Sequence, residues 1–153
     1  MKKTFLFLGL CLNLFTLDAQ TTSTPSDWQL VEQTIQRYFE GVATGDSVIM
    51  GQTFHPSWQL QVFNEKGFAE IPKSEYLVGY KKHEKSPNFS ARIVSLDITN
   101  NIGSAKVEIS TSKLLFTDYF NLIKTNDGWF IVDKISTRTP HKTVVEPAPI
   151  PKN

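Results

Sequence analysis

Hydrophobic side chains recur at two spacings along this chain, helical near its start and alternating over most of the remainder. From residue 26 onward, apolar positions fall every three or four residues, which is typical of a helix that buries one face. This stripe consists of Trp28, Val31, Ile35, Tyr38 and Val42, and Phe39 widens it. Thr24 or Ser26 can cap the predicted helix, and Ser26 with Gln29 resembles a capping box. Gly45 supplies the left-handed residue that ends it.

Two shorter helices are predicted after the first. Asp46 can cap a helix over residues 46–54, and the His-Pro-Ser segment at 55–57 interrupts it. Pro72 suits the first turn of a third helix over residues 72–82, whose sequence is PKSEYLVGYKK. All three helices therefore precede the longer strands of the chain.

Alternation of apolar and polar residues predicts strands in the rest of the chain. A short strand over residues 58–63 and a return over 68–71 can form a hairpin around the turn NEKG. Longer strands are predicted over residues 89–99, 104–110, 115–125 and 129–137, with turns at NNIG and at NDG. The alternation is clearest at Ala105, Val107 and Ile109, which share one face.

This order of elements predicts an α+β fold, because helices on one side of an antiparallel sheet bury their apolar faces against it. A strongly curved sheet can wrap the long first helix and leave a cone-shaped cavity into which alternate strand side chains point. We therefore expect three N-terminal helices packed on a curved antiparallel sheet. They form one domain over residues 24–138 with a single core.

The two ends of the chain differ in composition from this domain. Two lysines precede an apolar run over residues 4–17, which is short for a bilayer-spanning helix of about 20 residues. Ala19 suits signal-peptide cleavage, so we interpret residues 1–19 as a signal peptide and expect an exported protein, periplasmic or secreted. An uncleaved membrane anchor stays open as the alternative. Residues 139–153 hold four of the eight prolines without apolar periodicity and predict a disordered tail.

Charge and cysteine content exclude several classes of function. Removal of the signal peptide takes two lysines and one aspartate from 16 basic and 15 acidic residues and leaves 14 of each. A formal charge of zero argues against nucleic acid binding and against electrostatic attachment to a membrane. Cys11 is the only cysteine, and His55, His83 and His141 lack metal-ligand spacing. We therefore expect no metal and no cofactor.

Two polar side chains on predicted apolar faces are candidates for a site. Tyr38 lies on the stripe of the first helix, where it either packs in the core or donates a hydrogen bond into a cavity. Asp118 shares a strand face with Phe116, Phe120 and Leu122. A carboxylate there must be partnered, protonated or in a wet cavity. A structural hydrogen bond and a ligand contact both stay open for Asp118.

Three segments together resemble a known superfamily. They are QRYFEGVATGD at 36–46, FHPSW at 54–58 and DYFNLIKTNDGWFIVDKIS at 118–136. They are similar to the nuclear-transport-factor-2-like (NTF2-like) superfamily, nearest to its SnoaL-like, putative lumazine-binding branch. The resemblance covers residues 26–138 and implies a cone-shaped, cystatin-like α+β fold and frequent homodimers through the outer sheet face. The superfamily includes enzymes and non-catalytic binding domains, so the fold does not fix the function.

Comparison with ketosteroid isomerases gives each residue an expected role. In those enzymes a helix tyrosine and a protonated strand aspartate form an oxyanion hole, and a second aspartate moves the proton. The resemblance places Tyr38 on the tyrosine and Asp118 on the hydrogen-bond donor. Ungapped matching places Val62 on the base, and valine cannot take a proton. His55 is the alternative base, and it can equally cap the end of the second helix.

We expect a non-catalytic domain that binds a small, largely apolar ligand in its cavity. The candidate ligand-binding residues are Tyr38, His55, Trp58, Tyr76, Asp118 and Phe120, and none has a predicted catalytic role. Two alternatives stay open, a homodimeric interaction domain without a ligand and an isomerase- or cyclase-type enzyme. The enzyme requires Tyr38, His55 and Asp118 to converge, with His55 as the base. A cavity below about 300 Å³ would argue against ligand binding.

Overall fold

The structure, a computed structural model, describes residues 24–141 of the 153-residue chain. The predicted signal peptide at residues 1–19 lies outside the described residues, and so does most of the predicted tail. Export and a disordered tail therefore stay predictions. Residues 139 and 140 belong to the last strand of the sheet, so the folded part extends slightly past residue 138.

Three helices form where the sequence predicts them. They are α1 (Asp27–Thr44), α2 (Ser47–Thr53) and α3 (Lys73–Val78). α1 begins with a complete capping box, in which Ser26 and Gln29 each accept a hydrogen bond from the other's backbone N–H. Gly45 ends α1 in the left-handed conformation, and the Asp46 side chain caps α2. α3 is shorter than expected because it stops before Gly79, a poor helix former.

The remaining elements are six strands of one sheet. They are β1 (Phe54–Asn64), β2 (Gly67–Pro72), β3 (Ser90–Thr99), β4 (Ile102–Ser110), β5 (Leu114–Thr125) and β6 (Gly128–Pro140). Their order across the sheet is β2-β1-β6-β5-β4-β3. The neighbouring pairs are antiparallel except for β1 and β6, which run parallel. This parallel pair departs from the expected antiparallel sheet because a long crossover, not a hairpin, connects the two strands.

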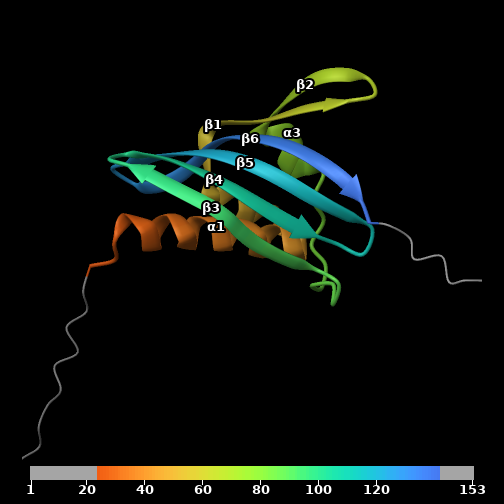
Figure 1. Ribbon diagram of the computed structural model, residues 1–153, viewed down its shortest axis with the longest axis horizontal. Coiled ribbons are helices and arrows are strands. Elements are labelled where there is room, and N and C mark those ends of the chain that lie inside the picture. Colours follow the sequence, from red (N-terminus) through yellow and green to blue (C-terminus); the bar gives the residue numbers. More distant parts are fainter. Residues whose placement is uncertain (1–23, 142–153) are drawn as a thin grey trace, which may run out of the picture.

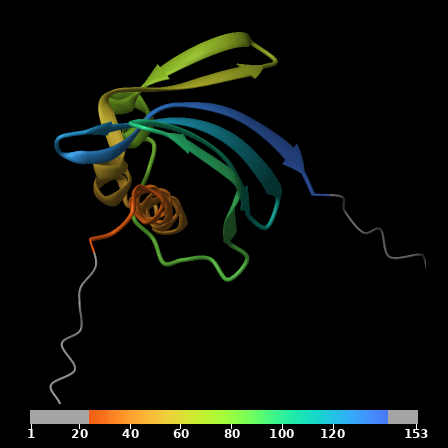
Figure 2. The same ribbon diagram turned by 60° about the vertical axis from the view of Figure 1, so that its left-hand side comes forward.

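The sheet curves around α1, and the two layers enclose the core. Figure 2 shows α1 nearly end-on inside the hollow of the sheet, with the β1–β2 hairpin at one edge. In Figure 1 the same helix lies under the strands, and α3 sits beside β1 and β6. The expected cone-shaped α+β fold is thereby confirmed.

The buried face of α1 differs in one position from the predicted stripe. Val31, Ile35 and Tyr38 are almost inaccessible to solvent, as expected. Trp28 is 49% exposed, and Leu30 packs against the core at the first turn instead. The core partners from the sheet are Phe54, Trp58, Leu60, Ala105, Val107, Ile109, Phe120, Leu122, Trp129 and Ile131. Trp28 was therefore wrongly assigned to the buried stripe.

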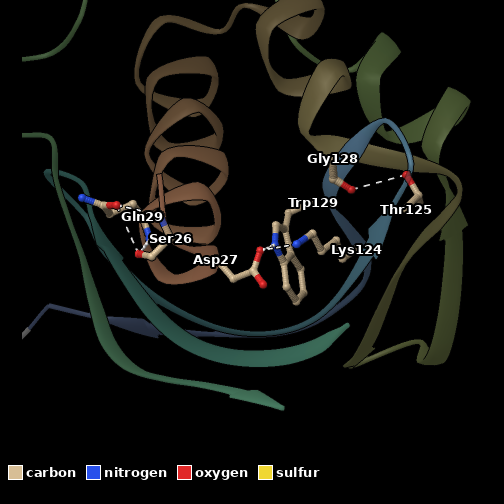
Figure 3. Close-up of polar contacts among 7 residues, drawn as sticks. All are labelled: Ser26, Asp27, Gln29, Lys124, Thr125, Gly128 and Trp129. Atoms are coloured by element: carbon tan, nitrogen blue, oxygen red, sulfur yellow. Dashed lines mark hydrogen bonds and ion pairs between the residues drawn. The ribbon is translucent and has the colours of Figure 1, made fainter. Parts of the chain in front are cut away.

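The first turn of α1 is tied to the turn between β5 and β6, as Figure 3 shows. Asp27 Oδ1 accepts hydrogen bonds from Lys124 Nζ at 2.6 Å and from Trp129 Nε1 at 3.0 Å. These two donors lower the pKa of the Asp27 carboxyl. Thr34 Oγ1 adds a bond to the Trp129 carbonyl at 3.3 Å, so the helix is held across the hollow of the sheet.

A β-bulge in β6 decides which of its side chains face the hollow. Leu122 pairs with Ile131, whereas the preceding Asn121 pairs with Asp133, so Val132 is an extra residue. The extra residue reverses the alternation along the strand. Odd-numbered Ile131 points inward before the bulge, and even-numbered Lys134 points inward after it.

The outer face of the sheet carries exposed apolar side chains. Tyr119 and Ile135 are direct cross-strand partners, and both are about half exposed. The homodimer implied by the resemblance would use this face, and it stays a prediction. Among the helices of residues 24–141, none has the length and apolar character needed to cross a bilayer.

We predict that Gly45→Ala lowers the free energy of unfolding by about 2 kcal/mol or more, because the left-handed conformation and a steric overlap both penalise alanine. The backbone of Gly45 has φ +61°, and an added Cβ would overlap the carbonyl oxygen of Lys81. Urea denaturation measures the loss.

The matched control is Gly79→Ala at the end of α3. Gly79 has a right-handed backbone, and an added Cβ would make an ordinary contact with the Tyr76 carbonyl. Its stability should change by less than about 0.5 kcal/mol. Equal losses in the two variants would contradict the argument.

Candidate functional site

A cavity of about 740 Å³ lies between α1, α3, the β1–β2 hairpin and the concave face of the sheet. Its lining comes from α1 (Tyr38, Val42), the hairpin (Leu60, Val62, Phe63, Asn64, Glu65, Lys66), α3 and the residue after Gly79 (Tyr76, Tyr80), β4 and the following turn (Ile109, Thr111), β5 (Phe116, Asp118) and β6 (Lys134, Ser136, Thr137, Arg138). Exposed residues of the hairpin turn and Arg138 form its mouth. Tyr38, Asp118 and Lys134 form a fully buried polar wall.

Strand register brings the polar wall together. Asp118 is the direct partner of Ser136, and Phe120 is the direct partner of Lys134. All four lie on the concave face of the sheet, and the bulge in β6 is what places Lys134 and Ser136 there. Tyr38 reaches the same point from α1, on the opposite side of the hollow.

Asp118 accepts two hydrogen bonds and forms one ion pair. The Tyr38 hydroxyl lies 3.2 Å from Oδ2, and the Ser136 hydroxyl lies 2.5 Å from Oδ1. Lys134 Nζ lies 3.5 Å from Oδ2, and both side chains of this ion pair are at most 5% exposed. The Asp118 carboxylate therefore has partners within the protein, which is one of the three arrangements that its place on an apolar face allowed.

Lys134 is surrounded by acceptors and aromatic rings. Its ammonium donates to the Tyr38 hydroxyl at 3.0 Å and to the Tyr76 hydroxyl at 2.8 Å. It also lies 5.4 Å from the ring centroid of Tyr38 and 4.6 Å from that of Tyr76. Cation–π attraction and the hydrogen bonds together offset the loss of hydration of the ammonium.

A pair of tyrosines continues the polar wall toward the cavity. The hydroxyls of Tyr76 and Tyr80 lie 2.5 Å apart, and both side chains are partly buried. Burial raises the pKa of Tyr38, Tyr76 and Tyr80 above the usual tyrosine value. All three hydroxyls therefore keep their protons at neutral pH.

The six predicted site residues divide into three groups. Tyr38, Tyr76 and Asp118 line the cavity and share one hydrogen-bond network through Lys134. Trp58 and Phe120 do not line the cavity and instead pack in the core behind it.

Trp58 and Phe120 support the tyrosines of the network. Trp58 stacks on Phe54 at 4.1 Å between ring centroids and leans against Tyr76 at 4.8 Å. Phe120 meets Tyr38 edge-on at 5.1 Å. These contacts fix the rings that carry the hydroxyls.

His55 lies apart from the other predicted site residues. Helix α2 ends at Thr53, so His55 belongs to β1 and is not part of a helix end. Its ring packs edge-on to Phe130 and its Nδ1 lies 2.7 Å from the Ser57 hydroxyl. Tyr38, His55 and Asp118 therefore do not converge on one point.

Sequence reasoning missed Lys134, the central residue of the network. Strict alternation from Trp129 places Asp133 and Ile135 on the inner face and Lys134 on the outer face. The bulge reverses this assignment, and nothing in the local sequence WFIVDKIS requires a bulge. One signal in the sequence could have pointed to Lys134: a carboxylate at Asp118 on the inner face needs a cationic partner.

A second hollow of about 840 Å³ lies between α1 and β3. Its lining is Gln29, Glu32, Gln33, Gln36, Arg37, Glu40, Ala91, Arg92 and Ile93. None of these side chains is buried, and most are charged or amide-bearing. The larger volume therefore reflects an open polar groove, and the less open cavity beside Tyr38 is the better candidate for a binding site.

One family model, described as putative lumazine-binding, matches residues 26–136. The chain belongs to the putative lumazine-binding family. No curated protein is similar enough in sequence to count as a match.

Solved structures agree with this assignment. The fold is similar to an NTF2-like protein of unknown function from Shewanella baltica OS155, with a TM-score of 0.67 and 25% identity over 75% of this chain and 95% of that one. An NTF2-like protein of unknown function from Methylobacillus flagellatus KT is similar with a TM-score of 0.65 and 20% identity, over 77% of this chain and 96% of that one. A ketosteroid isomerase-like protein from Erwinia carotovora atroseptica SCRI1043 is similar with a TM-score of 0.57 and 12% identity, over 75% of this chain and 98% of that one. At this identity the last comparison shows the fold alone.

In this member of the putative lumazine-binding family, the cavity lining contains two carboxylates, Asp118 and Glu65. Val62 lines the cavity at the position that the isomerase resemblance assigns to the base. Asp118 is occupied by three donors, and Glu65, the other carboxylate of the lining, lies at the exposed hairpin turn. Within residues 24–141, no group of three or more histidine, cysteine or acidic side chains could hold a metal ion.

We predict that Asp118→Ala and Lys134→Met each lower the free energy of unfolding by about 3 kcal/mol, because each leaves a buried charge without its partner. The double variant should lose less than the sum of the two, since it leaves no unpaired charge. Urea denaturation of all three variants tests this. Glu108→Ala, which breaks the exposed pair with Arg92, is the control and should cost less than about 1 kcal/mol. Additive losses at positions 118 and 134 would argue against a coupled pair.

We predict that stability falls at alkaline pH. Tyr38, Tyr76 and Tyr80 have raised pKa values in the folded state, whereas unfolded tyrosines ionise at pH ~10. Their contribution to the free energy of unfolding is complete below pH ~10. It is lost as the pH rises above this value, because the unfolded state then releases protons that the folded state retains. Burial lowers the pKa of Lys73, so this lysine makes stability rise with pH. It is one group against three tyrosines.

The measurement is the free energy of unfolding in urea between about pH 8 and pH 11, a range that brackets the ordinary tyrosine pKa. Tyr80→Phe should show a smaller alkaline loss than the native chain. Ultraviolet absorbance of tyrosinate, recorded in the folded protein, reports ionisation directly. Equal alkaline slopes for the two chains would refute the assignment to buried tyrosines.

Proposed function

We propose that this domain binds a small, largely apolar molecule in the cavity, with the buried polar wall as its hydrogen-bonding side. The observation that carries the proposal is a partly enclosed cavity of about 740 Å³ that ends on a buried network of Tyr38, Asp118 and Lys134. Ligand sites in proteins are commonly cavities of roughly 300–1,000 Å³, apolar for the most part, with a few convergent polar groups.

The size of the cavity favours a ligand over a residual space. A domain that served only as an interaction module would gain stability by filling this volume, because each unfilled methyl-sized space costs about 1 kcal/mol. The lining instead combines apolar Val42, Leu60, Ile109 and Phe116 with the polar wall. This combination supports binding.

Binding without turnover is the form of the proposal that the residues favour. An isomerase or cyclase needs a free proton acceptor beside its substrate. Val62 offers none, His55 lies outside the cavity, and Asp118 is occupied by its three donors. The predicted signal peptide would place this binding domain outside the cytoplasm.

We predict that the apolar fluorophore N-phenyl-1-naphthylamine binds the cavity with enhanced, blue-shifted emission. Val62→Trp should abolish this binding because the larger side chain fills the hollow that Val62 lines. Fluorescence titration gives the dissociation constant.

The control is Ile135→Trp, which adds the same kind of side chain to the outer face of the sheet, where Ile135 is 52% exposed. It should bind the probe like the native chain. Equal binding by native protein and Val62→Trp would show that the probe sits elsewhere, and absence of binding to the native chain would defeat the proposal.

A further inference from the structure

The hydrogen bonds of the polar wall can be counted proton by proton. The three protons of the Lys134 ammonium face the Tyr38 hydroxyl, the Tyr76 hydroxyl and Asp118. The Tyr38 proton goes to Asp118, and so does the proton of Ser136. Each donor of this inner part of the network therefore has an acceptor.

The count leaves one proton over at the outer part of the network. Tyr76 and Tyr80 bring two hydroxyl protons, and the 2.5 Å bond between them uses one. Among residues 24–141, the only other hydrogen bond to either hydroxyl is the one that Tyr76 accepts from Lys134. One of the two O–H groups is therefore a donor without a protein acceptor.

The direction of the chain identifies which hydroxyl this is. Tyr76 accepts from the Lys134 ammonium at 2.8 Å, and a hydroxyl that accepts from a cation is polarised into a stronger donor. Either hydroxyl could donate in this bond, and the polarisation by Lys134 favours donation from Tyr76 to Tyr80, which leaves the Tyr80 proton free. Tyr80 lines the cavity, so its proton is available to a molecule bound there.

The charges of the wall indicate what kind of acceptor fits. Lys134 and Asp118 carry opposite charges 3.5 Å apart, so the buried network is neutral as a whole. A neutral acceptor oxygen satisfies the free donor without burying a net charge, whereas an amine would place a second donor against it. A carbonyl oxygen on an apolar body meets both conditions.

We propose that the Tyr80 hydroxyl is the specificity-determining donor of the cavity and that the ligand is an apolar molecule bearing a neutral carbonyl oxygen. This inference rests on the proposed ligand-binding function and adds a chemical class to it. It assigns recognition to the Lys134–Tyr76–Tyr80 chain, because Tyr38 and Asp118 are already occupied by each other and by Lys134.

The test uses two fluorescent probes of similar size. One is 6-propionyl-2-(dimethylamino)naphthalene, a ketone whose emission moves to the red when its carbonyl accepts a hydrogen bond. The other is N-phenyl-1-naphthylamine, which has no oxygen. Tyr80→Phe should weaken binding of the ketone about fivefold to tenfold, the effect of one lost hydrogen bond, and should move its bound emission to the blue. Binding of the amine should stay unchanged.

Tyr119→Phe is the matched control, because Tyr119 is 53% exposed on the outer face of the sheet. It should bind both probes like the native chain. If Tyr80→Phe binds the ketone with native affinity and emission while the amine also binds, the Tyr80 inference is overturned and the ligand-binding proposal stands. If the native chain binds the amine and not the ketone, the inference is likewise overturned. If it binds neither probe, the ligand-binding proposal itself fails.

A second measurement on the native chain does not depend on any variant folding. The ketone is compared with 6-propyl-2-(dimethylamino)naphthalene, in which a methylene replaces the carbonyl and the shape is kept. Hydrophobicity alone favours the propyl compound, so a preference of about fivefold for the ketone would reveal the hydrogen bond. Tighter binding of the propyl compound would overturn the inference.

Discussion

The ion pair between Lys134 and Asp118 is the constraint on which the rest of the site depends. Both charges lie in a water-excluded space between α1 and the sheet, where an unpaired ion costs several kcal/mol. The pair is tolerable because Tyr38, Tyr76 and Ser136 supply the remaining hydrogen bonds. Those partners come from α1, α3 and β6, so satisfying one pair of charges fixes the elements that surround the cavity.

The general architecture could be predicted from the sequence because local signals were strong and agreed with each other. The capping box at Ser26, the left-handed Gly45 and the cap at Asp46 placed α1 and α2 correctly. Inward Asp118 and Tyr38 were also found, since a polar side chain on an apolar face is conspicuous. The order of the elements allowed a cone-shaped sheet, and the resemblance to the NTF2-like superfamily implied the same shape.

The parts that could not be predicted depend on contacts between distant segments. The bulge at Val132 turns Lys134 inward, and it follows from pairing with β5 and not from the sequence of β6. His55 was assigned to a helix end, but the strand that begins at Phe54 carries its side chain away from the cavity. Trp28 fits the helical period and is still 49% exposed. Periodicity predicts which face of a helix is apolar, but it does not predict how far the sheet covers that face.

The same ion pair bears on the isomerase alternative, in which the resemblance assigns Tyr38 and Asp118 to the oxyanion hole. In the isomerases the strand aspartate is protonated and donates a hydrogen bond to the substrate oxygen. Here Asp118 accepts hydrogen bonds from Tyr38 and Ser136 and forms an ion pair with Lys134, so both of its oxygens already have partners within the protein. Lys134 on the neighbouring strand and Asp118 thus form the centre of a closed network without net charge. The donor that such a network still presents to the cavity is displaced to its far end, beyond Tyr76, where a bound molecule can accept from it without disturbing the buried charges.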